Sequence, residues 1–319
     1  QGTACVSIYG GNTPQSEYEF LTGNTISFLP SGAIAYNLYI KKDTPSLVSQ
    51  LSEQGYECIA MHPEKATNFN RNQVYPRLGF SQFLTEDDFT DIVKIRELCS
   101  DQSVYDKMID LYENKQEGQK LFLYGVTMQN HGGYTYEGED FTPLVQTVGL
   151  NKTYDKVNQY LTCMRYTDEA LENLIGYFSD VDEHVMIVMF GDHHGDVGSD
   201  FYEELYGKKL IDVEGEQYET RYKTPFFIWT NYEIEEKADE KISLNYLSTL
   251  AMQTANIPLT EYQSFLAELQ SHYPVISAAG IYDTEDNFYT WSNVEESADY
   301  SYMKEYQILE YYMLENYKK

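Results

Sequence analysis

Histidine and aspartate residues follow several short apolar runs in this chain. His62 follows "CIAM", His131 follows "VTMQN", and Asp192 and His193 follow "VMFG". Parallel sheets bind ligands beyond the carboxyl ends of their strands, so these side chains are expected at one edge of a sheet. A carboxylate next to an imidazole suits a borderline divalent cation. The spacing therefore predicts a functional site built from strand ends that lie far apart in the sequence.

The stretch "GGNTPQSEYEF", residues 10–20, places Thr13 between a glycine turn and a predicted helix. Thr is a common helix N-cap and Pro14 fits the first helical position, so a plain cap is the simplest interpretation. The preceding run "ACVSIY" predicts a strand, and a strand-to-helix junction is also where α/β enzymes present a nucleophile to a phosphate anion. These local residues leave both interpretations open.

Strand and helix patterns alternate around these positions. Helical spacing covers residues 44–55 and 154–178, and apolar runs of buried-strand length cover residues 120–128 and 183–190. A further strand is predicted just before His62. Strands separated by helices favour parallel pairing in a sheet covered on both faces. The sequence therefore predicts an α/β fold with a mostly parallel sheet and helices on both faces.

Composition and charge limit the classes of partner. Fifty-one acidic and 22 basic residues give a formal net charge of −29, which argues against nucleic acid or a bare anionic membrane as a surface partner. The four cysteines are widely spaced and form no CxxC pair, so neither a zinc knuckle nor a disulfide framework is indicated. No apolar run approaches the roughly 20 residues of a membrane helix, so the chain itself is expected to be soluble.

The C-terminal region predicts a small α+β subdomain. Residues 273–291 have strand and turn patterns, and residues 300–317 have helical spacing through Met303, Ile308, Tyr312 and Leu314. The domains are accordingly predicted as a catalytic domain over residues 1–272 and a small subdomain over residues 273–319.

Four stretches in order carry a resemblance to a known family. They are "GGNTPQSEYEFLTG", "MHPEKATNFNRNQVYPRLGF", "TMQNHGGY" and "FGDHHG". Together they resemble the motifs of the sulfatase-like phosphoglycerol transferases, the lipoteichoic acid synthase family of the alkaline phosphatase superfamily. The resemblance implies an alkaline phosphatase/sulfatase-like fold, and it favours Thr13 as a nucleophile over Thr13 as a cap.

The resemblance also implies roles for other residues. Thr13, Asp192 and His193 would be metal ligands, for manganese or magnesium, with zinc as an alternative on the histidine. The phosphoglycerol group would be surrounded by His62, Glu64, Phe69, Arg71 and His131. Phe69 stands where the synthases usually carry a tryptophan, and Glu64 where some carry an aspartate. His131 would also protonate the leaving alcohol, since a positioned imidazole can act as a general acid.

The family takes a further metal ligand, a glutamate, from a strand that precedes the nucleophile segment. Neither Glu17 nor Glu19 matches that motif position. We therefore expect the sequence to be part of a longer protein whose upstream segment carries the glutamate and any membrane anchor.

The expected function is an extracellular, metal-dependent phosphoglycerol transferase of a Gram-positive-type cell envelope. The donor would be a phosphatidylglycerol-like lipid, the intermediate a glycerophospho-threonine, and the acceptor a polymer, glycolipid or glycan. A sulfatase would need the C/S-x-P-x-R pattern, which "NTPQS" does not supply. The alternatives are a related phosphodiesterase and a non-catalytic binding module that keeps the pocket without a competent metal.

Overall fold

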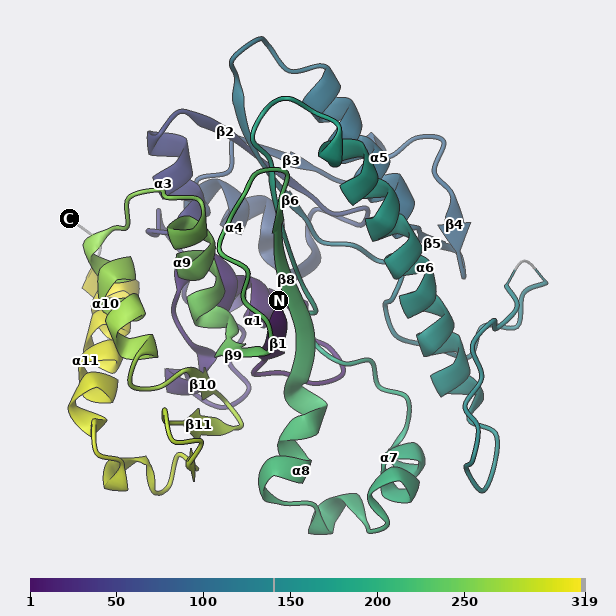
Figure 1. Ribbon diagram of the computed structural model, residues 1–319, viewed down its shortest axis with the longest axis vertical. Helices are drawn as coiled ribbons and strands as arrows, with labels where there is room; N and C mark the ends of the chain where they lie inside the picture. The colour runs from purple at the N-terminus through teal and green to yellow at the C-terminus, as the bar shows by residue number, and fades with distance from the viewer. Residues whose placement is uncertain (140, 317–319) are drawn as a thin grey trace.

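The computed structural model describes residues 1–139 and 141–316, in which strands and helices alternate along the chain (Figure 1). The strands are β1 (Gly2–Cys5), β2 (Tyr56–Met61), β3 (Gln82–Leu84), β4 (Lys94–Ile95), β5 (Leu98–Cys99), β6 (Lys120–Gly125), β7 (Met186–Phe190), β8 (Lys223–Thr230), β9 (Glu240–Ser243), β10 (Val275–Ser277), β11 (Gly280–Tyr282) and β12 (Phe288–Tyr289). The α-helices are α1 (Thr13–Thr22), α2 (Ala35–Leu38), α3 (Leu47–Glu53), α4 (Arg71–Leu78), α5 (Asp101–Glu113), α6 (Asp155–Ser179), α7 (Ser199–Tyr206), α8 (Gly215–Glu219), α9 (Leu244–Thr254), α10 (Glu261–Gln270) and α11 (Tyr300–Tyr311).

Two sheets form the centre of the molecule, in the orders β7-β8-β1-β9 and β3-β2-β6. The expected parallel pairing is found for β1 with β9, and for β2 with both β3 and β6. Strand β8 differs, because it runs antiparallel to both β1 and β7. The segment between β7 and β8 folds into α7 and α8 at the end of the sheet where β7 stops (Figure 1). The chain therefore re-enters the sheet from that end and runs back.

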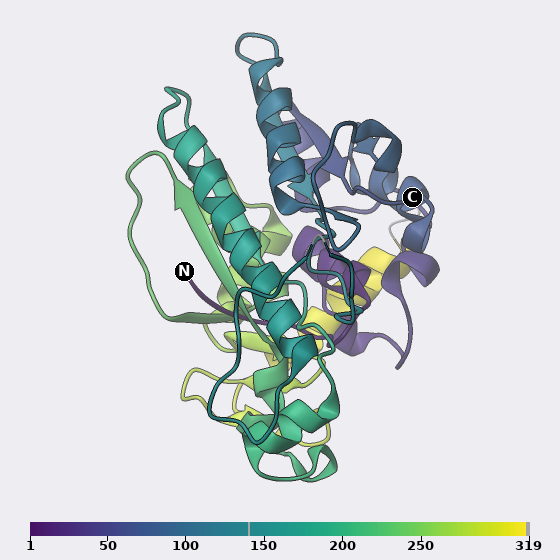
Figure 2. The same ribbon diagram turned by 90° about the vertical axis from the view of Figure 1, so that its right-hand side faces the viewer.

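Helices cover both faces of these sheets. Helices α1 and α9 pack together on one side, and α5 and α6 pair on the other, with α6 crossing the view in Figure 2. Side chains of β7 alternate between the two layers: Val188 and Phe190 join the central core cluster with α1, whereas Ile187 and Met189 join the cluster with α6. This alternation is the period of two expected of a strand. The predicted helix at 154–178 is confirmed as the 25-residue α6.

Strands β6 and β7 are less buried than their sequences predict. The four residues Cys58 to Met61 of β2 are at most 3% exposed, whereas the side chains of β7 are all only half-buried. Strand β2 has a partner on each side, but among the described residues β6 pairs only with β2, and β7 only with β8. The expectation of buried strands was therefore wrong for these two, because within residues 1–139 and 141–316 each lacks a neighbour along one edge.

The C-terminal elements pack on α9 and α10. Tyr246, Leu269, Tyr273 and Tyr306 are buried together in a second cluster, and Glu310 of α11 accepts hydrogen bonds from Tyr18 and Thr25 of the N-terminal part. The boundary at residues 272/273 stays a prediction. The predicted apolar face of α11 was partly wrong, because Ile308 is 65% exposed while Glu310 is 1% exposed.

Within the described residues no helix is both long enough and apolar enough to cross a membrane.

Two buried carboxyl groups, Glu19 of α1 and Glu310 of α11, lie near enough for their charges to interact. Burial raises the pKa of Glu19 to about 7 and that of Glu310 to about 8, although hydrogen bonds to both groups oppose the shift. A carboxyl whose folded-state pKa is raised keeps its proton while the unfolded chain loses it. The free energy of unfolding is therefore expected to fall, by an amount on the order of a few kcal/mol, as the pH rises from about 5 to about 8.

Denaturant titrations across this pH range measure the effect. A Glu310→Gln variant, which keeps the shape of the side chain without its titration, should show a flatter profile. Glu17 does not interfere, because its pKa is lowered and it titrates below this range. A wild-type stability that is constant or rises between these pH values would contradict the prediction.

All four cysteines, Cys5, Cys58, Cys99 and Cys163, are buried and unpaired. Burial raises the pKa of the Cys5, Cys58 and Cys99 thiols to about 11. The expectation of buried thiols at Cys58 and Cys163 is confirmed, and the described residues contain no disulfide.

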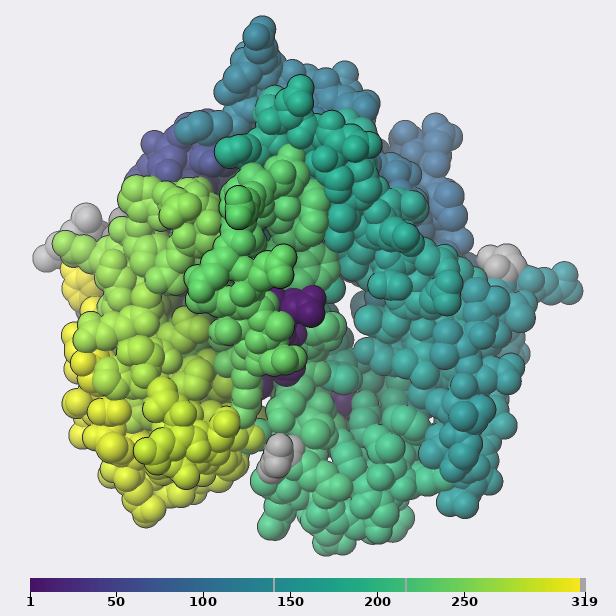
Figure 3. Space-filling model, in the orientation of Figure 1, coloured from purple at the N-terminus to yellow at the C-terminus, as the bar shows by residue number. Residues whose placement is uncertain are grey.

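The space-filling view shows the surface hollowed beside the N-terminus, between β8 and α6 (Figure 3).

Candidate active site

Thr13 is the first residue of α1, and its side chain does not cap the helix. The N-cap is Asn12, whose left-handed backbone (φ 69°) follows the glycine pair, and its side chain makes no capping hydrogen bond. The Thr13 hydroxyl instead donates a 2.7 Å hydrogen bond to Oδ2 of Asp192, 179 residues away in the sequence. The cap interpretation is therefore wrong, and the hydroxyl is held at the junction between α1 and the loop after β7.

Asp192 and His193 follow β7 and face the Thr13 hydroxyl. Nε2 of His193 lies 3.3 Å from the same Oδ2 atom that accepts from Thr13. Oδ1 of Asp192 accepts from the backbone N–H of His193, and the Asp192 carbonyl accepts from Ser16 of α1. Three heteroatoms of different kinds, a hydroxyl oxygen, a carboxylate oxygen and an imidazole nitrogen, therefore meet at one point.

This donor set fits a divalent cation. Nδ1 of His193 lies 2.8 Å from the His194 carbonyl, which only accepts, so Nδ1 carries the proton and Nε2 presents a lone pair. Metal-binding histidines typically donate their second N–H to a carbonyl in this way. The set is small, because the described residues contain no group of three or more His, Cys, Asp or Glu side chains arranged to hold a metal. His194 points elsewhere, with Nε2 against the Lys223 carbonyl.

A second group of predicted residues surrounds Glu17, one turn along α1. Arg71 is 1% exposed, and its Nε and Nη2 both donate to the Glu17 carboxylate. Tyr75 donates to the other carboxylate oxygen at 2.8 Å. Burial would raise the pKa of Glu17, but the charge and hydrogen bonds of Arg71 outweigh it and lower that pKa. The guanidinium of Arg71, which was predicted to lie beside the phosphoglycerol group, is thus engaged by Glu17.

His62, at the end of β2, lies close enough to Arg71 and Glu17 for their charges to affect its pKa. Its Nδ1 faces the Val126 carbonyl at 2.8 Å, so Nδ1 carries a proton and Nε2 is an acceptor. Burial, and then the charge of Arg71, lower the pKa of His62. His62 is accordingly a neutral imidazole at neutral pH.

The remaining predicted residues lie at the margins of these groups. The ring of Phe69 stacks under the Arg71 guanidinium at 5.5 Å, and Glu64 accepts from Asn68 at 3.2 Å. His131 is exposed, and within the described part of the chain its ring forms no hydrogen bond or ion pair with the other site residues. Its backbone carbonyl is held by Arg96 at 2.8 Å. The catalytic role of His131 stays a prediction.

Two residues of this region were not predicted as part of the site. Glu17 fixes Arg71, and Arg96 fixes the loop after β6 through the carbonyls of Gln129 and His131 while its guanidinium lies over Tyr134. Both are buried charged residues, and burial of a charged side chain has no signal in the sequence. Their partners lie more than 30 residues away, so no local pattern marks them.

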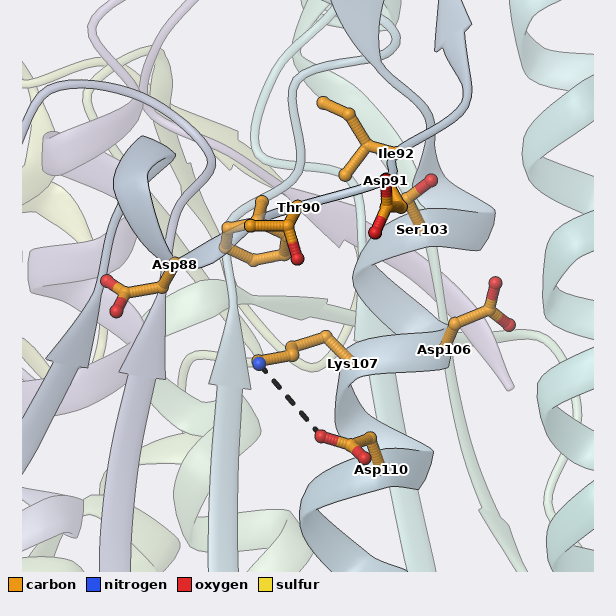
Figure 4. A pocket seen from close by; sticks show the side chains of 9 residues that line it. Asp88, Thr90, Asp91, Ile92, Ser103, Asp106, Lys107 and Asp110 are labelled. Atoms are coloured by element: carbon orange, nitrogen blue, oxygen red, sulfur yellow. Dashed lines mark ion pairs between the residues drawn. The ribbon is translucent and has the colours of Figure 1, made fainter.

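A pocket of about 240 Å³ lies elsewhere, between the loop at residues 88–92 and α5 (Figure 4). Its lining includes Asp88, Asp91, Asp106 and Asp110, and the one lysine, Lys107, pairs with Asp110 at 3.9 Å. None of the predicted site residues lines it. Since these carboxylates repel a phosphate, the pocket is not a candidate for the phosphoglycerol group.

A model of the sulfatase family matches residues 1–257, most of the chain. The chain belongs to the sulfatase family. Among curated proteins it is 28% identical over 274 residues to a putative cyclic beta-1,2-glucan modification protein of Rhizobium meliloti, covering 84% of this chain and 42% of that protein. It is 29% identical over 215 residues to the lipoteichoic acid synthase of Staphylococcus aureus, covering 64% of this chain and 32% of that protein. The chain thus spans less than half the length of these relatives.

Solved structures show the same fold. The phosphoglycerol transferase GacH of Streptococcus pyogenes, in complex with sn-glycerol-1-phosphate, has a TM-score of 0.75 at 23% identity and covers 97% of this chain and 75% of its own. The lipoteichoic acid synthase LtaP of Listeria monocytogenes has a TM-score of 0.71 at 18% identity and covers 98% of this chain and 83% of its own. The alkaline phosphatase/sulfatase-like fold of this family member, and its resemblance to the lipoteichoic acid synthases, are confirmed.

Proposed function

We propose that this sulfatase-family chain is the catalytic domain of a phosphoglycerol transferase that uses Thr13 as its nucleophile. The observation that carries the proposal is the 2.7 Å hydrogen bond from the Thr13 hydroxyl to Asp192, with His193 at the same oxygen. A threonine hydroxyl is a weak nucleophile unless a metal or a base stabilises its alkoxide. The proteins that this chain resembles include a phosphoglycerol transferase and lipoteichoic acid synthases, which supports this class of reaction.

Thr13, Asp192 and His193 would hold the cation, which is manganese or magnesium in this proposal, with zinc as the alternative. When bound, such an ion lowers the pKa of a coordinated hydroxyl and offsets charge on phosphoryl oxygens. The Thr13 hydroxyl directs its proton at Asp192, which leaves an oxygen lone pair for phosphorus. The N-terminal end of α1, where Thr13 is the first residue, lies at the same place, and its positive dipole end favours a phosphate anion.

The transfer takes two displacements. In the first, the Thr13 oxygen bonds to phosphorus while the bond from phosphorus to the lipid alcohol breaks, and that alcohol takes up a proton, which we assign to His131. In the second, an acceptor hydroxyl displaces the Thr13 oxygen and gives its proton to His131, while the Thr13 oxygen takes its proton back from Asp192. Neutral His62 offers Nε2 to a glycerol hydroxyl, and Arg71, which Glu17 holds in place, forms part of the wall of the head-group site.

The donor in this proposal is a phosphatidylglycerol-like lipid, and the acceptor is a hydroxyl of a polymer, glycolipid or glycan. Both meet the domain at the outer face of the cell membrane, to which polypeptide outside these 319 residues would anchor it. A phosphodiesterase would use water as the acceptor, so the product distinguishes the two classes.

Transfer of a labelled head group from phosphatidylglycerol vesicles tests the proposal. Activity should disappear with a chelator and return with Mn²⁺ or Mg²⁺. In calorimetry, His193→Gln should weaken Mn²⁺ binding at least about 100-fold, because a direct ligand is lost. His194→Gln is the matched control, since its imidazole faces the Lys223 carbonyl, and it should leave Mn²⁺ binding unchanged. Full transfer after exhaustive chelation would exclude the metal-dependent mechanism.

A further inference from the structure

The β4–β5 hairpin ends in a turn that is unfavourable for its residues. Ile95 of β4 pairs with Leu98 of β5, so Arg96 and Glu97 alone form the turn. Both have a left-handed backbone, with φ of 53° and 66°. Two-residue turns of this kind favour Asn-Gly, because most side chains crowd the backbone at positive φ. Backbone strain persists where the surrounding structure enforces it, and it is concentrated at functional sites, so this turn is a candidate for a role in the reaction.

The side chain of Arg96 is buried although it starts at a hairpin tip. It is 6% exposed, and its guanidinium lies over the ring of Tyr134, with 4.9 Å from Cζ to the ring centroid. Its Nη2 donates to the carbonyls of Gln129 and His131, but its Nε has no hydrogen-bond partner within the described residues. None of the ion pairs among residues 1–139 and 141–316 includes this arginine. A buried guanidinium without a carboxylate is unfavourable, so stability alone does not account for its position.

Arg96 is the distant residue that holds His131. The side chains of Gln129 and Asn130 donate hydrogen bonds of 3.1 and 2.7 Å to residues of α6. His131 follows them without such an anchor, because its ring makes no hydrogen bond with the described residues. Its N–H donates to the nearby Met128 carbonyl, and its carbonyl accepts from Arg96 at 2.8 Å. The direction of the His131 ring therefore depends on a hydrogen bond from the hairpin.

Tyr134 connects the hairpin to the loop after β7. It is 1% exposed, and its hydroxyl donates to the Asn130 carbonyl at 2.7 Å. Its ring packs in one cluster with Val197, and a Cβ at Gly195 would lie 2.2 Å from its hydroxyl oxygen, so the loop after β7 passes directly against it. Arg96 lies on the same ring. The hairpin therefore fixes the loop after β6 relative to the loop that carries the donor set for the cation.

We propose that Arg96 is a positioning residue for the first displacement, in which it holds His131 where its imidazole protonates the leaving lipid alcohol. This inference rests on the proposed function and adds a residue to it. When the bond from phosphorus to the alcohol oxygen breaks, the proton moves from the His131 imidazole to that oxygen. Arg96 acts through the loop after β6, because its N–H groups are directed at backbone carbonyls.

Two donors with different leaving groups test the proposal on the Mn²⁺-loaded protein. The lipid alcohol of phosphatidylglycerol needs a proton to leave, whereas 4-nitrophenol in a glycerophosphate ester leaves readily as its anion. Release of the leaving group is followed over a single turnover, so that only the first displacement is measured. Arg96→Met should slow release from phosphatidylglycerol at least about 100-fold, and release from the nitrophenyl ester less than about threefold. Equal slowing with both donors would show a merely structural role and would overturn the proposal.

Further variants test whether Arg96 and His131 act in the same step. His131→Ala should show the same dependence on the leaving group, and the double variant should be no slower than His131→Ala alone. Losses that multiply would contradict a shared step and refute the proposal. Glu97→Ala is the matched control, because Glu97 occupies the same strained turn with an exposed side chain, and it should keep the wild-type rate on both donors.

The outcome is separable from that of the proposed function. A slow His131→Ala with a fully active Arg96→Met would overturn this inference and leave the transferase proposal standing. Wild-type release by both variants would overturn this inference and also remove His131 from the proposed reaction.

Hydrogen–deuterium exchange adds a measurement that needs no turnover. Amides of residues 130–133 should exchange at least about tenfold faster in Arg96→Met, whereas those of β2 should not change. Unchanged exchange of residues 130–133 would show that the arginine does not hold the loop. Arg96→Met is expected to fold, because it removes an unpaired buried charge. Arg96→Lys, which keeps a cation without the guanidinium fork, is the second variant and should show the same dependence on the leaving group.

Discussion

A Thr13→Ala variant is expected to lose at least about a thousandfold in phosphoglycerol transfer while it remains folded. The substitution removes the oxygen that the proposed reaction bonds to phosphorus. Folding loses one partly buried hydrogen bond to Asp192, which is worth about 0.5–1.5 kcal/mol. The helix start is little affected, since Asn12 occupies the N-cap position. Head-group transfer and thermal unfolding, measured on the same samples, check both parts.

Ser16→Ala is the matched control for this variant. Ser16 also donates a hydrogen bond to Asp192, at 2.6 Å to its carbonyl, but its hydroxyl has no place in the reaction. The control should therefore lose similar stability and keep most of its transfer activity. Mass spectrometry of trapped wild-type protein should find glycerophosphate on the peptide that contains Thr13. Undiminished transfer by a folded Thr13→Ala protein would refute the role of Thr13 as the nucleophile.

A Glu17→Ala variant is expected to lose about 3–5 kcal/mol of unfolding free energy. Arg71 is almost fully buried, and removal of Glu17 leaves its guanidinium in the core without a counter-charge. Tyr75 would lose its acceptor as well. Urea titration near neutral pH, well above the lowered pKa of Glu17, measures the loss.

Two controls test whether the loss of stability comes from leaving the buried Arg71 charge unpaired, and not from removing a carboxylate as such. Glu169→Ala removes a carboxylate from an exposed pair with Arg165, which should cost less than about 1 kcal/mol. A double variant, Glu17→Leu with Arg71→Met, removes both buried charges and should recover much of the stability lost by Glu17→Ala. A Glu17→Ala protein that unfolds with wild-type stability would show that Arg71 finds another partner.

The predicted elements were those with strong hydrophobic periodicity. Helix α6 and strands β6 and β7 lie where the sequence predicts them, because each pattern is local and long enough to be distinctive. Their pairing was not predictable in the same way. Strand β8 runs antiparallel because of the path taken by α7 and α8, which no pattern within β8 itself encodes.

The candidate site was predicted only in part, because contacts between residues far apart in the sequence leave no local pattern either. The contact between Thr13 and Asp192 agrees with the expectation that strand ends meet, although the two residues are 179 positions apart. The pairing of Arg71 with Glu17 was not predicted, because a charged residue in a sequence gives no indication of whether it is exposed or buried. Glu310 shows the same limit, because α11 buries this carboxyl group, whereas hydrophobicity alone predicts that Ile308 is the buried residue.

The four buried cysteines have a practical consequence for where this domain can fold. Because none of them forms a disulfide, correct folding needs no oxidant, and a reducing cytosol should yield the same structure as an oxidising cell exterior. Their raised thiol pKa values and lack of exposure make them slow to react with alkylating reagents. A single cysteine introduced on the surface would therefore be the main site of labelling, which makes distance measurements between two chosen positions feasible without removing any native thiol.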